Sequence, residues 1–87
     1  MLKINKDTKR FIFRHPVLAM KTFLFVSEAI YFLTENGVKT REDRNGIIER
    51  WAYRCCKIGI DEKLEEKEII EEVINFEAFK TWFITNA

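Results

Sequence analysis

The most reactive side chains in this chain belong to two adjacent cysteines, Cys55 and Cys56, in the stretch RWAYRCCKIGI. Such a pair could act as a redox switch, supply half of a metal site, or provide two small core residues. Neighbouring residues of a helix point about 100° apart, so these sulfur atoms are poorly placed to bind one metal ion. A zinc site also needs about four ligands, and the chain adds only one histidine. We predict that Cys55 is a small buried residue and Cys56 a boundary residue.

No other set of residues has the pattern of a catalytic site. The three glycines, at positions 37, 46 and 59, are isolated and form no phosphate-binding loop. His15 precedes Pro16 in a basic segment, where a single histidine is more often structural or solvated than catalytic, and Ser27 lies between apolar residues. A small helical bundle also offers little concave surface for a substrate. We therefore predict a protein that is not an enzyme and that holds no cofactor and no metal.

The composition predicts an all-α fold. The chain has 87 residues, of which 47% are hydrophobic and 33% are charged, with only three glycines and one proline. So few glycines and prolines leave little material for the tight turns of a β protein. We expect residues 1–87 to form a single helical domain, a small bundle of three to four helices. Residues 1–15 are expected to form a short helix or an arm packed on the bundle.

The most apolar segment, residues 16–36, is predicted to be the central helix of that bundle. Pro16 suits the first position of a helix, and Gly37 suits the position just after its end. Lys21, Glu28 and Glu35 fall on one narrow stripe, and apolar residues cover most of the remaining surface. A membrane span is the alternative, but Lys21 and Glu28 would be costly in lipid. We therefore expect a helix that other helices wrap, and no membrane.

A second helix is predicted over residues 40–58, with Thr40 as its N-cap and Gly59 at its end. One of its surfaces carries a tyrosine among basic residues, which could stack on a base, bind a phosphate or anchor a protein interface. The alternative is an ordinary solvated face on which Tyr53 covers the stems of its neighbours. The candidate binding residues on this helix are Arg41, Arg44, Arg50, Tyr53, Arg54 and Lys57.

A third helix is predicted over residues 61–74, with Asp61 as its N-cap, followed by a bend at Asn75 and a short helix over 76–85. The acidic residues of the third helix are expected to form a solvated face, although such a helix can also imitate a row of phosphates. The candidate partner-binding residues here are Glu65, Glu68 and Glu72.

Charge is unevenly distributed although the net charge is only +1. Residues 1–21 carry six basic side chains against one acid, and residues 61–77 carry eight acids against two basic side chains. Two cysteines are too few for a disulfide framework, so a reducing, cytoplasmic location is expected. The lysine- and isoleucine-rich composition would suit a small protein of a microbe or of one of its viruses or mobile elements.

Three functions follow as hypotheses. The first is a protein-binding module, a regulator or inhibitor that docks on a larger protein, which could belong to a nucleic-acid-processing complex. The second is a nucleic-acid-binding domain that uses the basic face of helix 40–58, although a net charge of +1 is low for this class. The third is a self-associating protein, because so small a domain can leave aromatic surface uncovered. The aromatic residues considered for self-association are Trp51, Phe79, Trp82 and Phe83.

Overall fold

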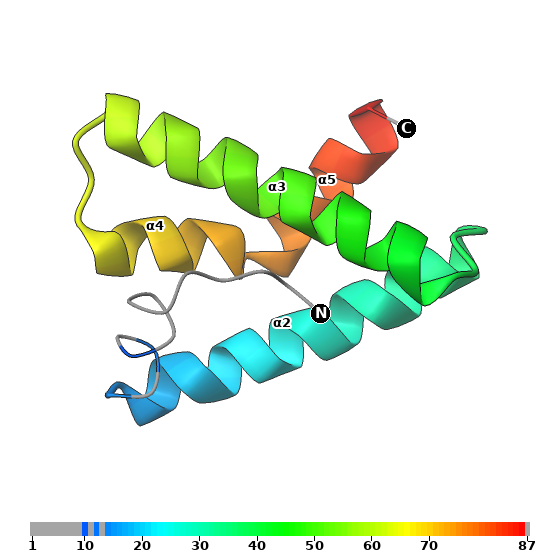
Figure 1. The fold of residues 1–87 in the computed structure, drawn as a ribbon, viewed down its shortest axis with the longest axis horizontal. Coiled ribbons are helices and arrows are strands. Elements are labelled where there is room, and N and C mark those ends of the chain that lie inside the picture. Colours follow the sequence, from blue (N-terminus) through cyan, green and yellow to red (C-terminus); the bar gives the residue numbers. More distant parts are fainter. Residues whose placement is uncertain (1–9, 11, 13, 87) are drawn as a thin grey trace.

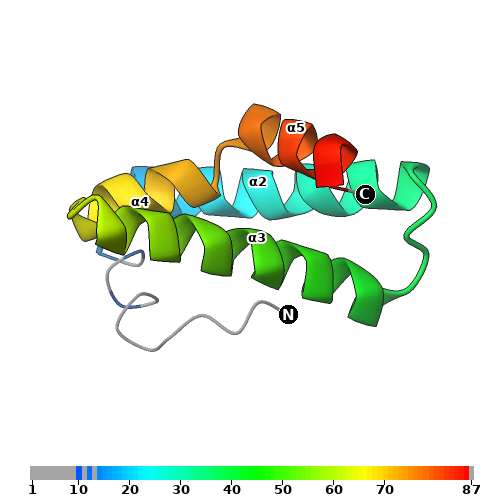
Figure 2. The same ribbon diagram turned by 90° about the horizontal axis from the view of Figure 1, so that it is seen from above.

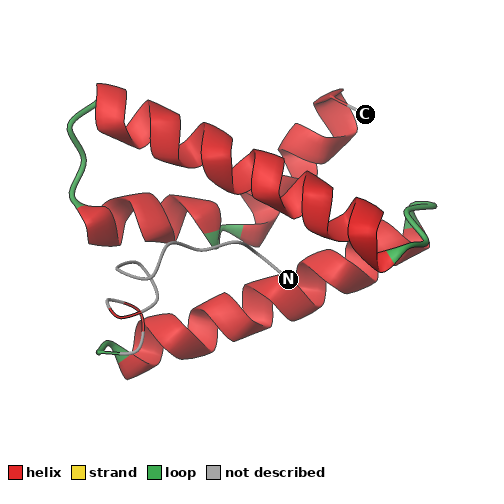
Figure 3. Ribbon diagram, in the orientation of Figure 1, coloured by secondary structure: helices red, strands yellow, loops and turns green. Residues whose placement is uncertain are grey.

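The computed structural model describes residues 10, 12 and 14–86, and these residues confirm the all-α bundle (Figure 1). The labelled helices are α2 (Pro16–Glu35), α3 (Arg41–Asp61), α4 (Glu66–Val73) and α5 (Phe76–Asn86). Within the described part of the chain there is no strand (Figure 3). The predicted short helix or arm over residues 1–15 lies mostly outside the described residues, but Ile12 is helical and its side chain is buried.

The ends of α2 lie where the sequence predicts them. Pro16 is the first residue of the helix, where its missing N–H group costs nothing. Gly37 has φ +90°, which an L side chain rarely adopts, and its N–H donates to the Thr34 carbonyl at 3.3 Å. The Val38 N–H donates to the Leu33 carbonyl at 2.9 Å, and the two bonds form a Schellman end.

The start of α3 is also as predicted, because the backbone N–H of Asp43 donates to Thr40 Oγ1 at 3.1 Å. The predicted end at Gly59 is wrong, since α3 continues to Asp61. The left-handed residue that ends the helix is Lys63, with φ 58°. The N–H of Leu64 then donates to the Gly59 carbonyl at 2.8 Å and completes a second Schellman end.

Gly59 serves helix packing rather than helix termination. It is buried, and a Cβ atom at this position would overlap the side chain of Ile69, with Ile69 Cδ1 only 2.9 Å away. The absence of a side chain therefore lets α4 lie close against α3. The predicted N-cap at Asp61 is also wrong, because α3 still includes Asp61 and α4 starts at Glu66, with Glu65 as its N-cap.

The break between α4 and α5 lies at the predicted bend at Asn75. Helix α4 ends at Val73, and Asn75 Oδ1 accepts a hydrogen bond of 3.1 Å from the N–H of Ala78 in the first turn of α5. The asparagine side chain thus caps α5. Seen from above, α5 leaves α4 at an angle and lies over α2 (Figure 2).

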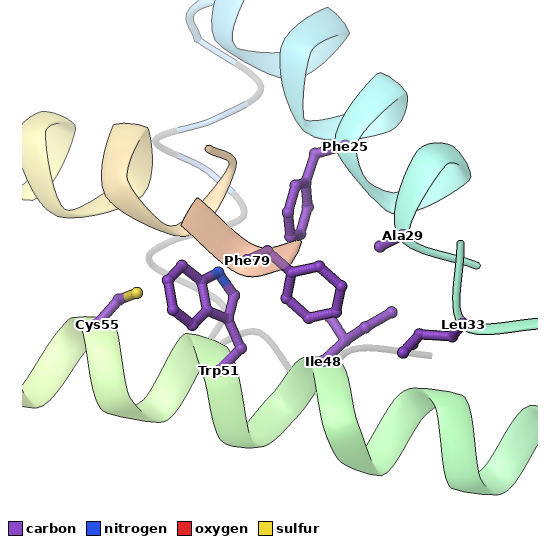
Figure 4. Close-up of a cluster of buried hydrophobic side chains, with 7 residues drawn as sticks. All are labelled: Phe25, Ala29, Leu33, Ile48, Trp51, Cys55 and Phe79. Carbon is purple, nitrogen blue, oxygen red and sulfur yellow. The ribbon is translucent and has the colours of Figure 1, made fainter. Parts of the chain in front are cut away.

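Helices α2 and α3 converge at the loop that joins them and diverge toward their other ends, where α4 lies between them (Figure 1). The core forms where α5 meets both long helices. Phe79 of α5 has no exposed surface, and it points between Phe25 of α2 and Ile48 and Trp51 of α3 (Figure 4). Its ring contacts that of Phe25 at a centroid distance of 5.6 Å and that of Trp51 at 5.9 Å, both edge to face.

Trp51 also ties α3 to the α4–α5 junction through its polar atom. Its indole Nε1–H donates to the carbonyl of Val73 at 2.7 Å. That carbonyl is at the last residue of α4, where the helix itself supplies no partner. Trp51 and Phe79 are buried, and Trp82 and Phe83 pack against them. These four rings, considered above for self-association, therefore cover one another within the chain instead of forming an open surface.

The expected wrapping of α2 is incomplete. Only four of its side chains are buried, those of Leu18, Phe25, Ala29 and Leu33, all on one side of the helix. Helices α4 and α5 have 8 and 11 residues and are too short to enclose a helix of 20 residues. α2 therefore forms one side of the bundle, and its far side is left to the solvent.

Candidate protein-binding surfaces

Four of the residues predicted for the basic surface of α3 do share one exposed face. They are Arg50, Tyr53, Arg54 and Lys57. The ring of Tyr53 is 72% exposed, which is high for a tyrosine in a folded domain. The guanidinium of Arg54 lies 5.6 Å from the centroid of the Trp51 ring, a cation–π contact that fixes one edge of the face.

Arg41 and Arg44 do not belong to that face. Arg44 lies on the side of α3 toward the preceding loop, and its Nη1 donates to the carbonyls of Lys39 at 3.0 Å and Val38 at 3.4 Å. This arginine therefore holds the α2–α3 loop in place. Arg41 is exposed in the first turn, nine residues before Arg50 and so on the opposite side of the helix.

The predicted acidic residues of α4 are exposed, as a solvated face requires. Glu65, Glu68 and Glu72 all face the solvent. Glu68 has a structural use, because its Oε1 accepts a hydrogen bond of 3.4 Å from the N–H of Glu65 at the start of the helix. Lys67 Nζ lies 3.9 Å from Glu71 Oε1, and this positive charge offsets part of the negative charge of α4. The acidic surface is therefore less uniform than a row of phosphates.

The two cysteines are free. Cys55 is buried, which confirms its prediction, whereas Cys56, predicted to be a boundary residue, is exposed. Burial raises the pKa of the Cys55 thiol from 9.0 to about 11, although the neighbouring Arg54 charge opposes the shift. Burial also raises the pKa of Cys56. Among the described residues no group of three or more histidine, cysteine, aspartate or glutamate side chains could hold a metal ion.

We expect the two thiols to differ sharply in reactivity. At pH 8 a thiol reagent should label Cys56 and leave Cys55 unreacted on the same time scale, because thiolate access controls the rate. Labelling of Cys56 should be slower than that of an unfolded peptide thiol, since a raised pKa leaves less thiolate, and it should accelerate as the pH rises. Cys56→Ser should abolish the rapid phase. Two thiols that react at equal rates in the folded protein would contradict this arrangement.

The structure contains an apolar groove that the sequence did not predict. It has a volume of about 850 Å³ and lies between α2, α3 and α4. Ile69, Ile70 and Val73 line it from α4, and Glu49, Arg50 and Tyr53 line it from α3. This volume is within the range of ligand pockets, about 300–1,000 Å³, so the expectation of little concave surface was wrong.

A second unpredicted feature is the solvent side of α2, which we call the α2 face. It contains no charged residue and six large exposed apolar side chains, among which Val17, Met20 and Phe23 are 69%, 67% and 72% exposed. The sequence shows that the charged residues of α2 all fall on one stripe, but it does not show which of the apolar sides stays exposed. The α2 face consists of Val17, Met20, Phe23, Leu24, Ser27, Ile30, Tyr31 and Thr34.

By length and composition alone, α2 is long and apolar enough to cross a membrane. Only 22% of its most apolar stretch is buried in the bundle. Its four buried side chains nevertheless belong to the two apolar clusters of the core, so the helix is an integral part of the bundle.

No family model, no curated protein and no solved structure matches this chain.

Proposed function

We propose that this protein is a non-enzymatic helical module that binds protein, with the α2 face as its binding surface. The observation that carries the proposal is the exposure of six large apolar side chains on one uninterrupted helix face. Single exposed apolar residues are normal on soluble proteins, but contiguous apolar patches usually mark interaction sites. The same hydrophobic effect that forms the core therefore favours covering this face.

The composition of the α2 face resembles the centre of a protein interface. Such centres are depleted of charge and enriched in aromatic residues and methionine. Phe23, Tyr31 and Met20 supply these types, and charged residues lie only along one edge of the face. A module of this kind acts by covering the surface of its partner, which is how a small regulator or inhibitor works.

The chemistry of the cysteines supports a role without catalysis. A nucleophilic cysteine has a lowered pKa and a positive neighbour or a helix N-terminus to stabilise the thiolate. Cys55 is buried with its pKa raised to about 11, and the pKa of Cys56 is also raised. Neither thiol is activated.

Site-specific photocrosslinking tests the proposal in the cell that makes the protein. A photoreactive phenylalanine analogue in place of Phe23 should give one dominant protein adduct. The matched control carries the same analogue in place of Ile84, which is 66% exposed and belongs to α5 instead of the α2 face. The control should give no such adduct. An absence of adducts at Phe23, or the same adducts at both positions, would refute the α2 face as a protein-binding surface.

Nucleic-acid binding is the second candidate, and it rests on the cluster of Arg50, Tyr53, Arg54 and Lys57 on one exposed face. An exposed tyrosine among basic side chains suits stacking on a base with contacts to neighbouring phosphates. If this function holds, affinity for single-stranded RNA or DNA should fall steeply with salt and should be lost in the Arg50→Ala, Arg54→Ala double variant. Arg41→Ala is the control, because Arg41 is equally basic but lies on the opposite side of α3. No binding at low salt would remove this candidate.

A further inference from the structure

The spacing of residues on the α2 face is that of a coiled-coil seam. One row of residues repeats every seven positions: Val17, Leu24 and Tyr31. A second row lies three positions after each of them in the sequence: Met20, Ser27 and Thr34. This alternation of three and four residues is the pattern by which one helix packs along another. All six residues are exposed, so the seam has no partner within the described chain.

The two edges of this seam differ in chemistry. Lys21, Glu28 and Glu35 lie along one edge, and all are exposed. Phe23 and Ile30 lie along the other edge and are also exposed. One edge is therefore charged and the other is apolar, which restricts the ways in which two such helices can pair.

Pairing two copies of α2 in antiparallel orientation matches both edges at once. A two-fold axis perpendicular to the helices brings like edges together, so the charged edge of one copy meets the charged edge of the other. Lys21 of one copy then faces Glu28 of the second copy, and the symmetry repeats the pair. On the other edge, Phe23 faces Ile30. A parallel pair would instead set the charged edge against the apolar edge.

The position of the complementary charges also suits this arrangement. The midpoint between Lys21 and Glu28 falls beside Leu24, close to the middle of α2, which spans Pro16–Glu35. An axis at this point lets the two helices overlap along nearly their whole length. Small residues also fall opposite large ones, since Leu24 and Ser27 lie on either side of the middle of α2 and face each other across the axis.

We infer that the occupant of the α2 face is a second copy of this chain, paired through α2 in antiparallel orientation. This inference rests on the proposed protein-binding function of the α2 face and gives it a specific partner. The protein is then an isologous dimer in which each copy covers the apolar seam of the other. The basic face of α3 and the acidic face of α4 remain exposed on both copies, available for a larger partner.

A lipid surface is the competing occupant, and the charges argue against it. Helices that lie on membranes carry lysine and arginine along their polar edges, where they meet anionic lipid. The edge of the α2 face carries two glutamates and one lysine. Its charges complement a second copy of the same edge better than they complement an anionic surface.

Charge reversal tests the pairing on the full-length chain by sedimentation equilibrium. The unaltered protein should be a dimer. Lys21→Glu or Glu28→Lys alone should raise the dissociation constant by roughly tenfold or more, because each creates two like-charge pairs across the axis. A mixture of the two single variants should restore tight association, since glutamates on one chain then face lysines on the other. The double variant K21E/E28K should also recover.

Met20→Lys places a charge within the seam and should raise the dissociation constant by roughly a hundredfold. Ile84→Lys, at an equally exposed site on α5, should leave it unchanged. Circular dichroism and urea denaturation should show that both variants remain folded, because each site is exposed.

Several outcomes would overturn the inference. One is a monomer at every concentration, and another is a dimer that is indifferent to the charge reversals. A third is a monomer that sediments with neutral or anionic phospholipid vesicles through the α2 face. A Phe23 photocrosslink to a different protein, with no dimer, would overturn the self-pairing and still support the proposed function. A charge-dependent dimer with a Phe23 crosslink between two copies would support both.

Discussion

Phe79→Ala should destabilise the fold by about 3–5 kcal/mol, the usual cost of truncating a buried phenylalanine. Phe79 has no exposed surface and contacts aromatic rings from α2, α3 and α5. The substitution removes the apolar area of the ring and leaves a cavity at the point where three helices meet. Because small domains are stable by only about 5–15 kcal/mol, this loss should leave the protein close to unfolding at physiological temperature. Urea denaturation followed by circular dichroism measures the change.

The matched control for Phe79→Ala is Ile84→Ala in the same helix. Ile84 is 66% exposed, so its truncation should change the free energy of unfolding by less than about 0.5 kcal/mol. Similar effects of the two substitutions would mean that α5 does not pack as described.

Alanine substitutions at the two helical glycines of α3 should change the free energy of unfolding in opposite directions. Gly46→Ala should stabilise the protein by about 1 kcal/mol, since alanine has the higher helix propensity and a Cβ atom there meets nothing within 4 Å. Gly59→Ala gains the same propensity, but its Cβ atom overlaps the side chain of Ile69. Overpacking typically costs about 1–3 kcal/mol, so the net effect at Gly59 should be destabilising.

A double-mutant cycle separates the two contributions at Gly59. In an Ile69→Ala background the overlap disappears, and Gly59→Ala should then stabilise the protein, as Gly46→Ala does. If Gly59→Ala were stabilising in the unaltered protein, the close approach of α3 and α4 would not be a constraint on this fold.

The parts of the fold that were predictable are those specified by local chemistry. Pro16, Gly37, Thr40 and Asn75 act through their own backbone geometry or through a side-chain hydrogen bond to a nearby residue. These effects depend on a few neighbouring positions, so the sequence shows them directly. The burial of Cys55 followed from helical periodicity in the same way.

The errors arose where distant parts of the chain decide the outcome. Position 59 needs a glycine because the side chain of Ile69, in the next helix, occupies the space that a Cβ atom would take. The left-handed residue that ends α3 is Lys63, a residue type with no strong preference for that conformation. The exposure of the α2 face depends on the length of the helices that pack against α2, which hydropathy does not report. Arg41 and Arg44 were grouped with Arg50 by proximity in sequence, whereas their angles around the helix set them apart.

The central place of Phe79 has a consequence for the order of events during synthesis. The side chain that closes the core comes from the last helix, whereas Phe25 and Trp51, which it contacts, are made much earlier. Until α5 has been translated, α4 can pack between the diverging ends of α2 and α3, but the space that Phe79 fills beside Phe25 and Trp51 has no side chain in it. A growing chain therefore gains its long helices before the main cluster of its core can close.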